Sequence, residues 1–319
     1  MEHFANRLTA LIRQRRSCAV VGLDPHWHLI PEDIRTSSVK LFGKSPSACA
    51  EAIRRFCKEL IDAVAGHVPA VKPQSAFFEQ YGPAGMEALY EVMEHARAKG
   101  LLVIADVKRG DIGTTAEGYA RAWLGTVEVA GTVFEPFPAD AVTVNPYLGS
   151  DSITPFVDAA SGNGKGVFVL VKTSNPSSSE VQDLAVDGKP LYLKIAANLA
   201  PAAEKYVGSC GYSLLGAVAG GTFAKAGEEI RALIPRSFIL VPGYGAQGAG
   251  AAELKPFFNA DGLGAIVNSS RGIAFAYRSE PYASKFGESG WQAASEAAVI
   301  AMNEDIRAHT PHSKVAKNG

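Results

Sequence analysis

Short apolar runs rich in β-branched residues recur along the chain, with amphipathic segments between them. Runs that are apolar throughout, rather than alternating, are typical of parallel strands buried on both faces. The pattern predicts eight strands, at Cys18–Leu23, Val68–Lys72, Leu101–Val107, Ala141–Val144, Gly166–Val171, Ser213–Val218, Phe238–Val241 and Gly264–Val267. This count favours an α/β fold, a single (β/α)8 TIM barrel, with a doubly wound open sheet as the alternative.

The segments between the predicted strands carry apolar residues at steps of three and four, which is the period of a helix with one buried face. Ile53, Phe56, Leu60 and Val64 show this spacing. The pattern predicts further helices around Phe4–Ile12, Met86–Met93, Leu191–Val207, Ala224–Leu233 and Gln292–Arg307.

Two connections are longer than ordinary barrel loops. They span about 25–47 and 175–190, and both follow the carboxyl end of a predicted strand. Each is therefore either a lid over the C-terminal face or a plain surface insertion, and the Ser, Asp, Gly and Pro of 175–190 suit a mobile loop. We expect one barrel domain over 1–308 and a polar, disordered tail over 309–319.

The composition argues against two classes of binding partner, nucleic acids and membranes. The formal net charge of the 319 residues is −1, so no global field attracts nucleic acid or a membrane surface. The longest apolar runs are too short to cross a bilayer, and the N-terminus lacks the basic and apolar regions of a signal peptide. The four cysteines form no C-x-x-C pair or metal spacing. We expect a cytoplasmic protein with free thiols and no nucleic-acid or membrane partner.

Polar residues gather where the predicted strands end, and not where they begin. In a TIM barrel the carboxyl ends of the strands meet at the face that carries the active site. The strand ends supply Asp24, Lys72, Asp106, Lys108, Asn145, Thr173, Ser174, Pro242, Asn268 and Arg271.

The densest of these clusters is the D-x-K-x-x-D motif of Asp106, Lys108 and Asp111. Residues two apart on a strand point to the same side, so Asp106 and Lys108 project together with Cα atoms ~6.6 Å apart. Asp111 lies past the strand, in a loop that either folds back or reaches a neighbouring subunit. A lysine between carboxylates is held as an ammonium and suits proton donation, whereas a Schiff-base aldolase needs a neutral amine. The alternative is a structural salt-bridge network.

A glycine-rich stretch, Gly243-Tyr-Gly245-Ala-Gln-Gly248, follows the seventh predicted strand. Its G-x-G-x-x-G spacing matches a dinucleotide fingerprint, but only one strand follows it, and that strand ends without a ribose-binding acid. The position instead matches the usual phosphate site of barrels, with Arg271 as a bidentate partner. For Arg271 the alternative is an ordinary surface salt bridge.

His26 and His28 form an H-x-H pair after the first strand, a spacing used in metal-dependent hydrolases. The other histidines lie near the termini, at a strand start or in a helix, so no second half-site is evident. We therefore interpret His26 and His28 as loop residues.

With these residues assembled, the sequence resembles the orotidine 5′-phosphate decarboxylase family, in particular its longer bacterial, mycobacterial-type (type 2) form. The core motif is Asp106-Val-Lys108-Arg-Gly-Asp111-Ile, and the resemblance spans about residues 4–277. It implies decarboxylation of orotidine 5′-phosphate to uridine 5′-phosphate in pyrimidine biosynthesis, with Lys108 as proton donor between Asp106 and Asp111. It also implies a homodimer with Asp111 entering the partner's site, and no cofactor or metal. The implied substrate-binding residues are Asp24, Lys72, Thr115, Ser174, Pro242, Gln247 and Arg271.

Two other functions stay open at this point. A related barrel that shares D-x-K-x-x-D, such as a Mg²⁺-dependent sugar-acid phosphate decarboxylase, would require a metal. A non-catalytic phosphate-binding barrel would have no turnover to lose when Lys108 is replaced.

Overall fold

The computed structural model describes residues 1–245 and 250–315. Within these residues eight parallel strands close into a barrel. In barrel order they are β1 (Ala19–Leu23), β2 (Ala70–Pro73), β3 (Leu102–Arg109), β6 (Ala141–Val144), β7 (Gly166–Lys172), β10 (Leu215–Ala219), β11 (Ile239–Pro242) and β12 (Ala265–Ser269). Because β12 pairs with β1, with Val267 opposite Ala19, the sheet has no edge. The (β/α)8 barrel is confirmed and the open sheet is wrong.

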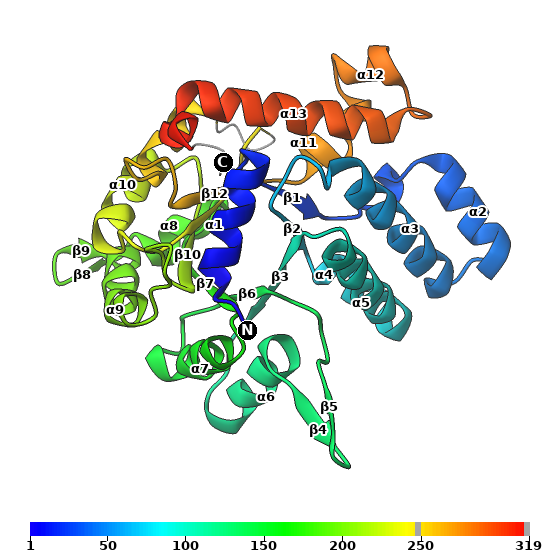
Figure 1. Cartoon of the computed structure of the whole chain (residues 1–319). Coiled ribbons are helices and arrows are strands. Elements are labelled where there is room, and N and C mark those ends of the chain that lie inside the picture. Colours follow the sequence, from blue (N-terminus) through cyan, green and yellow to red (C-terminus); the bar gives the residue numbers. More distant parts are fainter. Residues whose placement is uncertain (246–249, 316–319) are drawn as a thin grey trace.

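Helices surround this barrel (Figure 1). The predicted helices are all present, although their ends differ by a few residues from the expected ones. The longer helices are α1 (Phe4–Arg15), α3 (Pro46–Val64), α5 (Gly82–Ala98), α6 (Gly113–Leu124), α7 (Thr154–Gly162), α9 (Leu191–Lys205), α10 (Ala224–Leu233) and α13 (Trp291–His309). Shorter helical segments are α4 (Ala76–Glu79), η2 (Ser150–Ser152), η4 (Ala252–Phe257), α11 (Arg271–Ala274), η5 (Ala276–Arg278) and α12 (Tyr282–Phe286). None of the helices in the described ranges is long and apolar enough to cross a membrane.

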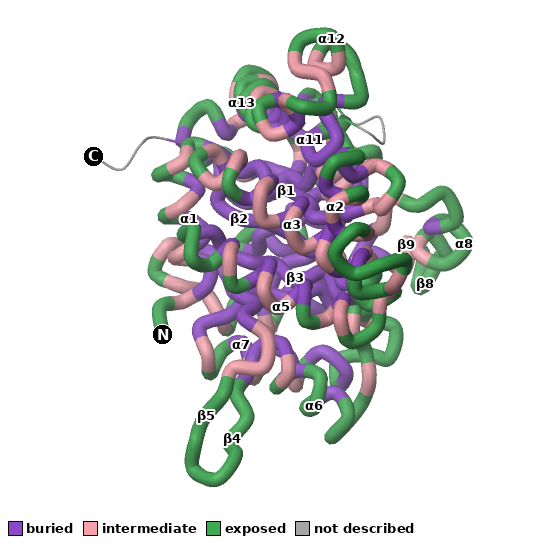
Figure 2. The backbone as a smooth tube through the Cα atoms, turned by 90° about the vertical axis from the view of Figure 1, so that its right-hand side faces the viewer, coloured by how far each residue is buried: buried purple, intermediate pink, exposed green. Residues whose placement is uncertain are grey.

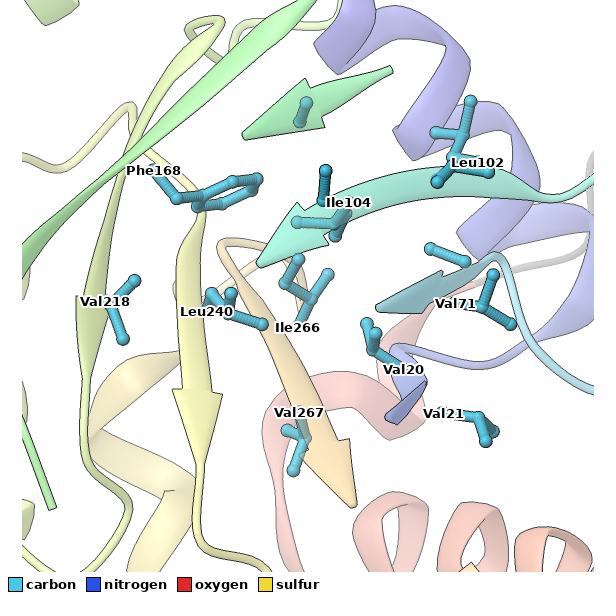
Figure 3. Packing of buried hydrophobic residues seen from close by; sticks show 14 of the residues in the cluster. Val20, Val21, Val71, Leu102, Ile104, Phe168, Val218, Leu240, Ile266 and Val267 are labelled. Carbon is cyan, nitrogen blue, oxygen red and sulfur yellow. The ribbon is translucent and has the colours of Figure 1, made fainter. Parts of the chain in front are cut away.

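The barrel strands are buried on both faces, as their apolar sequences predict. Figure 2 shows them enclosed by a more exposed layer of helices and loops. Ile104 of β3, Leu240 of β11 and Ile266 of β12 lie close together in the space that these strands enclose (Figure 3). The buried residues form one contiguous apolar cluster, which supplies a rigid frame for side chains at the strand ends.

Helix α1 packs against the end of the barrel where the strands begin. The Phe4 ring meets the Phe168 ring edge-on at 6.0 Å, and Arg7 bonds to Asp140 and to the carbonyl of Gly164. These contacts fix the N-terminal end of the barrel, so the opposite end is the one left to hold a ligand.

Both predicted insertions contain regular structure. The first holds η1 (Trp27–Leu29) and α2 (Glu32–Phe42), and α2 packs on the outer side of α3. The second holds η3 (Pro176–Ser178), α8 (Ser179–Gln182) and a small hairpin of β8 (Ala185–Val186) and β9 (Lys189–Pro190). A mobile loop at 175–190 stays a prediction.

The structure also differs from the sequence prediction in the C-terminal tail and at a hairpin between α6 and β6. The expected disordered tail is wrong for 309–315: after α13 the chain forms η6 (Pro311–Lys314), in which His312 is 2% exposed, and Val315 is buried as well. Residues 316–319 lie outside the described part. A hairpin of β4 (Val127–Val129) and β5 (Thr132–Phe134) was not predicted, although β-branched residues flank its Ala-Gly turn. It projects away from the barrel (Figure 1).

Candidate active site

A cavity of about 680 Å³ opens at the carboxyl ends of the barrel strands. Residues on or just after every barrel strand contribute to its wall, which is the arrangement that TIM-barrel enzymes use. The strand-end residues predicted from the sequence that line it are Asp24, Lys72, Asp106, Lys108, Thr173, Ser174, Pro242, Asn268 and Arg271.

Asp106 is the centre of a charged network in this cavity. Its Oδ2 accepts hydrogen bonds from Lys72 Nζ at 2.7 Å and from Gln74 Nε2 at 2.9 Å. Its Oδ1 accepts from Lys108 Nζ at 2.6 Å and from Thr143 Oγ1 at 2.9 Å. Four donors from three strands and the segment after β2 therefore fix one carboxylate between two ammonium groups.

Burial and charge act in opposite directions on this network. Burial alone would raise the pKa of Asp106, but the charges and hydrogen bonds of Lys72 and Lys108 outweigh it and hold that pKa well below its ordinary value. Burial would lower the pKa of Lys72, yet the carboxylates of Asp106 and Asp24 raise it. At neutral pH the site thus contains an ionised Asp106 and a charged Lys72.

Lys108 differs from Lys72 in its exposure to the cavity. Its side chain is 45% exposed, whereas that of Lys72 is 7% exposed. Pairing of β3 with β6 changes register between Ala105 and Arg109, and Lys108 has φ of 45°, an uncommon conformation for a non-glycine residue. Such conformations persist where surrounding contacts enforce them, and they cluster at functional sites. Lys108 is thus the lysine of the pair that is open to a bound ligand.

Asp24 and Asn268 present acceptors to the same cavity. Asp24 Oδ1 and Asn268 Oδ1 are buried and have no hydrogen-bond partner within the described residues. Buried polar atoms are nearly always paired in folded proteins, so these two oxygens suit the hydroxyl groups of a ligand. A Cβ on Gly22 would come within 1.9 Å of Ser270 Oγ and 3.2 Å of Asn268 Oδ1. A residue with a Cβ at position 22 would therefore displace the Ser270 side chain.

The glycine-rich loop after β11 forms another part of the cavity wall. Gly243 and Gly245 have φ of 107° and 74°, conformations that favour glycine. Pro242 and Gly243 line the cavity together with the exposed Arg271 after β12. The predicted contact Gln247 lies outside the described residues.

Two predicted site residues do not reach the cavity of their own chain. Asp111 lies in the turn before α6, where its Oδ1 accepts a hydrogen bond from the backbone N–H of Ile112 at 2.8 Å. Thr115 is exposed in the first turn of α6. Of the two possibilities for Asp111, folding back into its own site is not what the structure shows.

Several cavity residues were missed by the sequence analysis. Gln74 follows the Val-Lys-Pro motif directly, and Thr143 is the lone polar residue inside an apolar strand. Asn145 was expected at that strand end, but its side chain accepts from Tyr147 N instead of entering the cavity. For this strand, the polar residue inside the buried apolar run, Thr143, was therefore a better indicator of a cavity residue than Asn145, the polar residue after its end. Gln182 and Tyr244 are further lining residues that were missed.

His26 also lines the cavity, so its interpretation as a simple loop residue was incomplete. Its ring meets that of Phe77 at 4.4 Å. Burial lowers the pKa of His26; Asp24 partly offsets this, while His28 and Arg271 lower it further. Within the described residues, no three His, Cys, Asp or Glu side chains are grouped to hold a metal ion.

Comparisons with known proteins agree with this geometry. The model of the orotidine 5′-phosphate decarboxylase / HUMPS family matches residues 20–286. A Rhodopirellula baltica protein named orotidine 5′-phosphate decarboxylase is 47% identical over 96% of this chain and 100% of its own length. One of the same name from Caldicellulosiruptor saccharolyticus is 39% identical over 97% of this chain and 99% of its own.

Solved structures give the same result. The structure of Leishmania donovani OMP decarboxylase superposes with a TM-score of 0.72 at 33% identity, covering 96% of this chain and 98% of the other. The residues matched by the family model, 20–286, contain the complete Asp106-x-Lys108-x-x-Asp111 motif. They also contain seven of the eight barrel strands in full and all but the first residue of β1. From its fold, its charged cavity and these matches, the chain belongs to the orotidine 5′-phosphate decarboxylase / HUMPS family.

Proposed function

We propose that this protein decarboxylates orotidine 5′-phosphate to uridine 5′-phosphate and CO₂, as a step of pyrimidine biosynthesis. The observation that carries the proposal is the Lys72–Asp106–Lys108 network, in which a fixed, ionised carboxylate holds a cavity-facing ammonium. The printed name of the relatives at 47% and 39% identity over nearly the whole chain supports the same activity.

The chemistry of this reaction matches what the network offers. Loss of CO₂ from C6 of the pyrimidine leaves a carbanion that no neighbouring carbonyl is placed to delocalise, so the site must stabilise the charge electrostatically. The Lys108 ammonium supplies positive charge and then delivers its proton to C6. Asp106, at 2.6 Å from Lys108 Nζ, orients that ammonium, and Lys72 keeps Asp106 ionised.

The rest of the cavity divides among the parts of the nucleotide. On this proposal Asp24, whose Oδ1 is buried without a partner within the described residues, and Lys72 contact the ribose hydroxyls, and the cavity-lining Ser174 contacts the pyrimidine. The proposal assigns Pro242, Gln247 and Arg271 to binding of the phosphate. Binding of the phosphate, remote from C6, contributes energy to the distant chemical step.

The active form is a homodimer in which Asp111 and Thr115 complete the partner's site. This accounts for their position: both belong to the family motif region, yet neither lines the cavity of its own chain. Several large apolar side chains near these residues are exposed in the single chain and suit a buried interface. They are Ile112 and Tyr119, close to Asp111 and Thr115 in the sequence, and Tyr147 and Leu148, which follow β6. Sedimentation of the active protein as a strict monomer would refute the dimer.

The folded insertions at 25–47 and 175–190 support assignment to the longer bacterial, mycobacterial-type form. The proposal includes a cytoplasmic location, in keeping with four cysteines that are all free.

The direct test is the absorbance change on adding orotidine 5′-phosphate to purified protein. We expect turnover that added Mg²⁺ does not change. Absence of turnover with and without Mg²⁺ would overturn the proposal, and a strict Mg²⁺ requirement would favour the sugar-acid phosphate decarboxylase.

A further inference from the structure

A buried lysine outside the cavity wall connects the second insertion to the barrel. Lys172, the last residue of β7, is 2% exposed, and its Nζ donates to Asp183 Oδ1 at 2.6 Å and to Ser178 Oγ at 3.3 Å. The same Nζ lies 4.6 Å from the centre of the Phe223 ring. Because a buried charge is costly unless it is paired, Asp183 is tied to this place on the barrel.

The residue next to Asp183 enters the cavity. Gln182 Oε1 accepts from the backbone N–H of Thr173 at 2.8 Å, and its Nε2 donates to Thr173 Oγ1 at 2.7 Å. The Thr173 hydroxyl in turn donates to Asn175 Oδ1 at 2.6 Å. One side-chain amide from the insertion therefore fixes both the backbone and the side chain of Thr173.

Ser174 is held from the other side by the barrel itself. A Cβ placed on Gly220 would lie 2.9 Å from Ser174 Cβ, so the two backbones are in close contact. The Gly220 N–H also donates to the Lys172 carbonyl at 2.8 Å. The Thr173–Ser174 peptide thus lies between Gly220 of the barrel and Gln182 of the insertion.

We propose that Gln182 is a positioning residue for recognition of the base, and that the Lys172–Asp183 ion pair holds Gln182 in place. Gln182 acts through Thr173, setting the orientation in which the following residue, Ser174, meets the pyrimidine. This rests on the proposed function, which gives Ser174 its contact with the base. The insertion is on this account a part of the specificity apparatus and not a plain surface addition.

The test compares two ligands that differ by the base. Calorimetry gives dissociation constants for uridine 5′-phosphate and for ribose 5-phosphate with wild-type protein and with Gln182→Met, which keeps the size of the side chain and removes both hydrogen bonds. We expect uridine 5′-phosphate to bind about tenfold more weakly, the loss typical of one or two hydrogen bonds, and ribose 5-phosphate to be unchanged. For Asp183→Asn we also expect a rise in the ratio of the dissociation constant of uridine 5′-phosphate to that of ribose 5-phosphate, by a smaller factor than for Gln182→Met.

A matched control comes from the same short helix. Glu180 is exposed and does not line the cavity, so Glu180→Gln leaves both dissociation constants unchanged. If Asp183→Asn fails to fold, Gln182→Met still decides the question, because it leaves the ion pair intact.

The proposal is overturned if Gln182→Met weakens both ligands equally, which indicates a general structural role, or if it weakens neither. Turnover of orotidine 5′-phosphate by wild-type protein is measured separately. Failure of the proposed function appears in that assay, whereas failure of the positioning role appears in the ratio of the two dissociation constants.

Discussion

The Thr143 hydroxyl accepts a hydrogen bond from the backbone N–H of Lys108 at 3.0 Å. The same hydroxyl donates to Asp106 Oδ1 at 2.9 Å. One side chain on β6 therefore contacts the backbone of the proposed proton donor and also the carboxylate that orients it. This relationship explains how β3 holds Lys108 in its unusual backbone conformation beside a register change.

Replacing Thr143 by valine keeps the shape of the side chain and removes both hydrogen bonds. Because a buried carboxylate that loses a donor costs about 1–3 kcal/mol, we expect kcat to fall about tenfold and the free energy of unfolding to fall by about 1 kcal/mol. Steady-state kinetics and thermal unfolding measure the two effects. Thr143→Ser keeps the hydroxyl and is the control; equal kcat values for the valine and serine variants would argue against a role for the hydroxyl.

Gly22→Ala tests the close approach of β1 and β12 at the cavity. The added Cβ would lie 1.9 Å from Ser270 Oγ and 3.2 Å from Asn268 Oδ1, so both side chains must move. We expect a loss of about 1–3 kcal/mol in unfolding free energy, with weaker binding of uridine 5′-phosphate. Gly162→Ala, at the end of α7, adds a Cβ with nothing within 4 Å and should leave binding unchanged without lowering stability. A fully stable Gly22→Ala protein with normal binding would contradict the geometry.

The buried His312 makes stability depend on pH. Burial lowers its pKa below 6.5; its contact with the Gly262 carbonyl partly offsets this, and the charges of Arg307 and Arg16 lower the pKa further. The unfolded chain therefore takes up this proton first, so His312 reduces stability as pH falls from about 6.5 toward its folded pKa.

The check is the difference in melting temperature between about pH 7.5 and about pH 5.5. We expect this difference to be smaller for His312→Phe than for wild type, because phenylalanine binds no proton. Identical differences for the two proteins would show that residue 312 is not buried as the structure has it.

The shared site is tested by mixing two inactive variants. Lys108→Ala and Asp111→Ala chains are each expected to be nearly inactive alone. If Asp111 enters the partner's site, a mixed dimer contains one site with both residues intact, and an equal mixture regains about a quarter of wild-type activity per protomer. Activity of the mixture equal to the mean of the two separate variants would refute the shared site.

The eight strands and the polar residues at their ends were predictable because both follow from local sequence. A run of apolar residues and the polar residue that ends it are read without knowing the tertiary structure. The orientation of Thr143 toward Asp106 was not predictable, because it depends on the register between β3 and β6. Gln182 reaches Thr173 only through the fold of its insertion. From the sequence, His312 belongs to a polar tail. Its burial could not be predicted because it depends on packing against a distant segment of the chain that includes Gly262.

The central claim, that Lys108 is the proton donor of an orotidine 5′-phosphate decarboxylase, is tested most directly by comparing turnover of orotidine 5′-phosphate by wild-type protein and Lys108→Ala. We expect the substitution to reduce kcat by about 10³-fold, within the range of lost general acid catalysis, while uridine 5′-phosphate still binds. A Lys108→Ala protein that turns over substrate at the wild-type rate, or a wild-type protein with no turnover at all, would contradict the account.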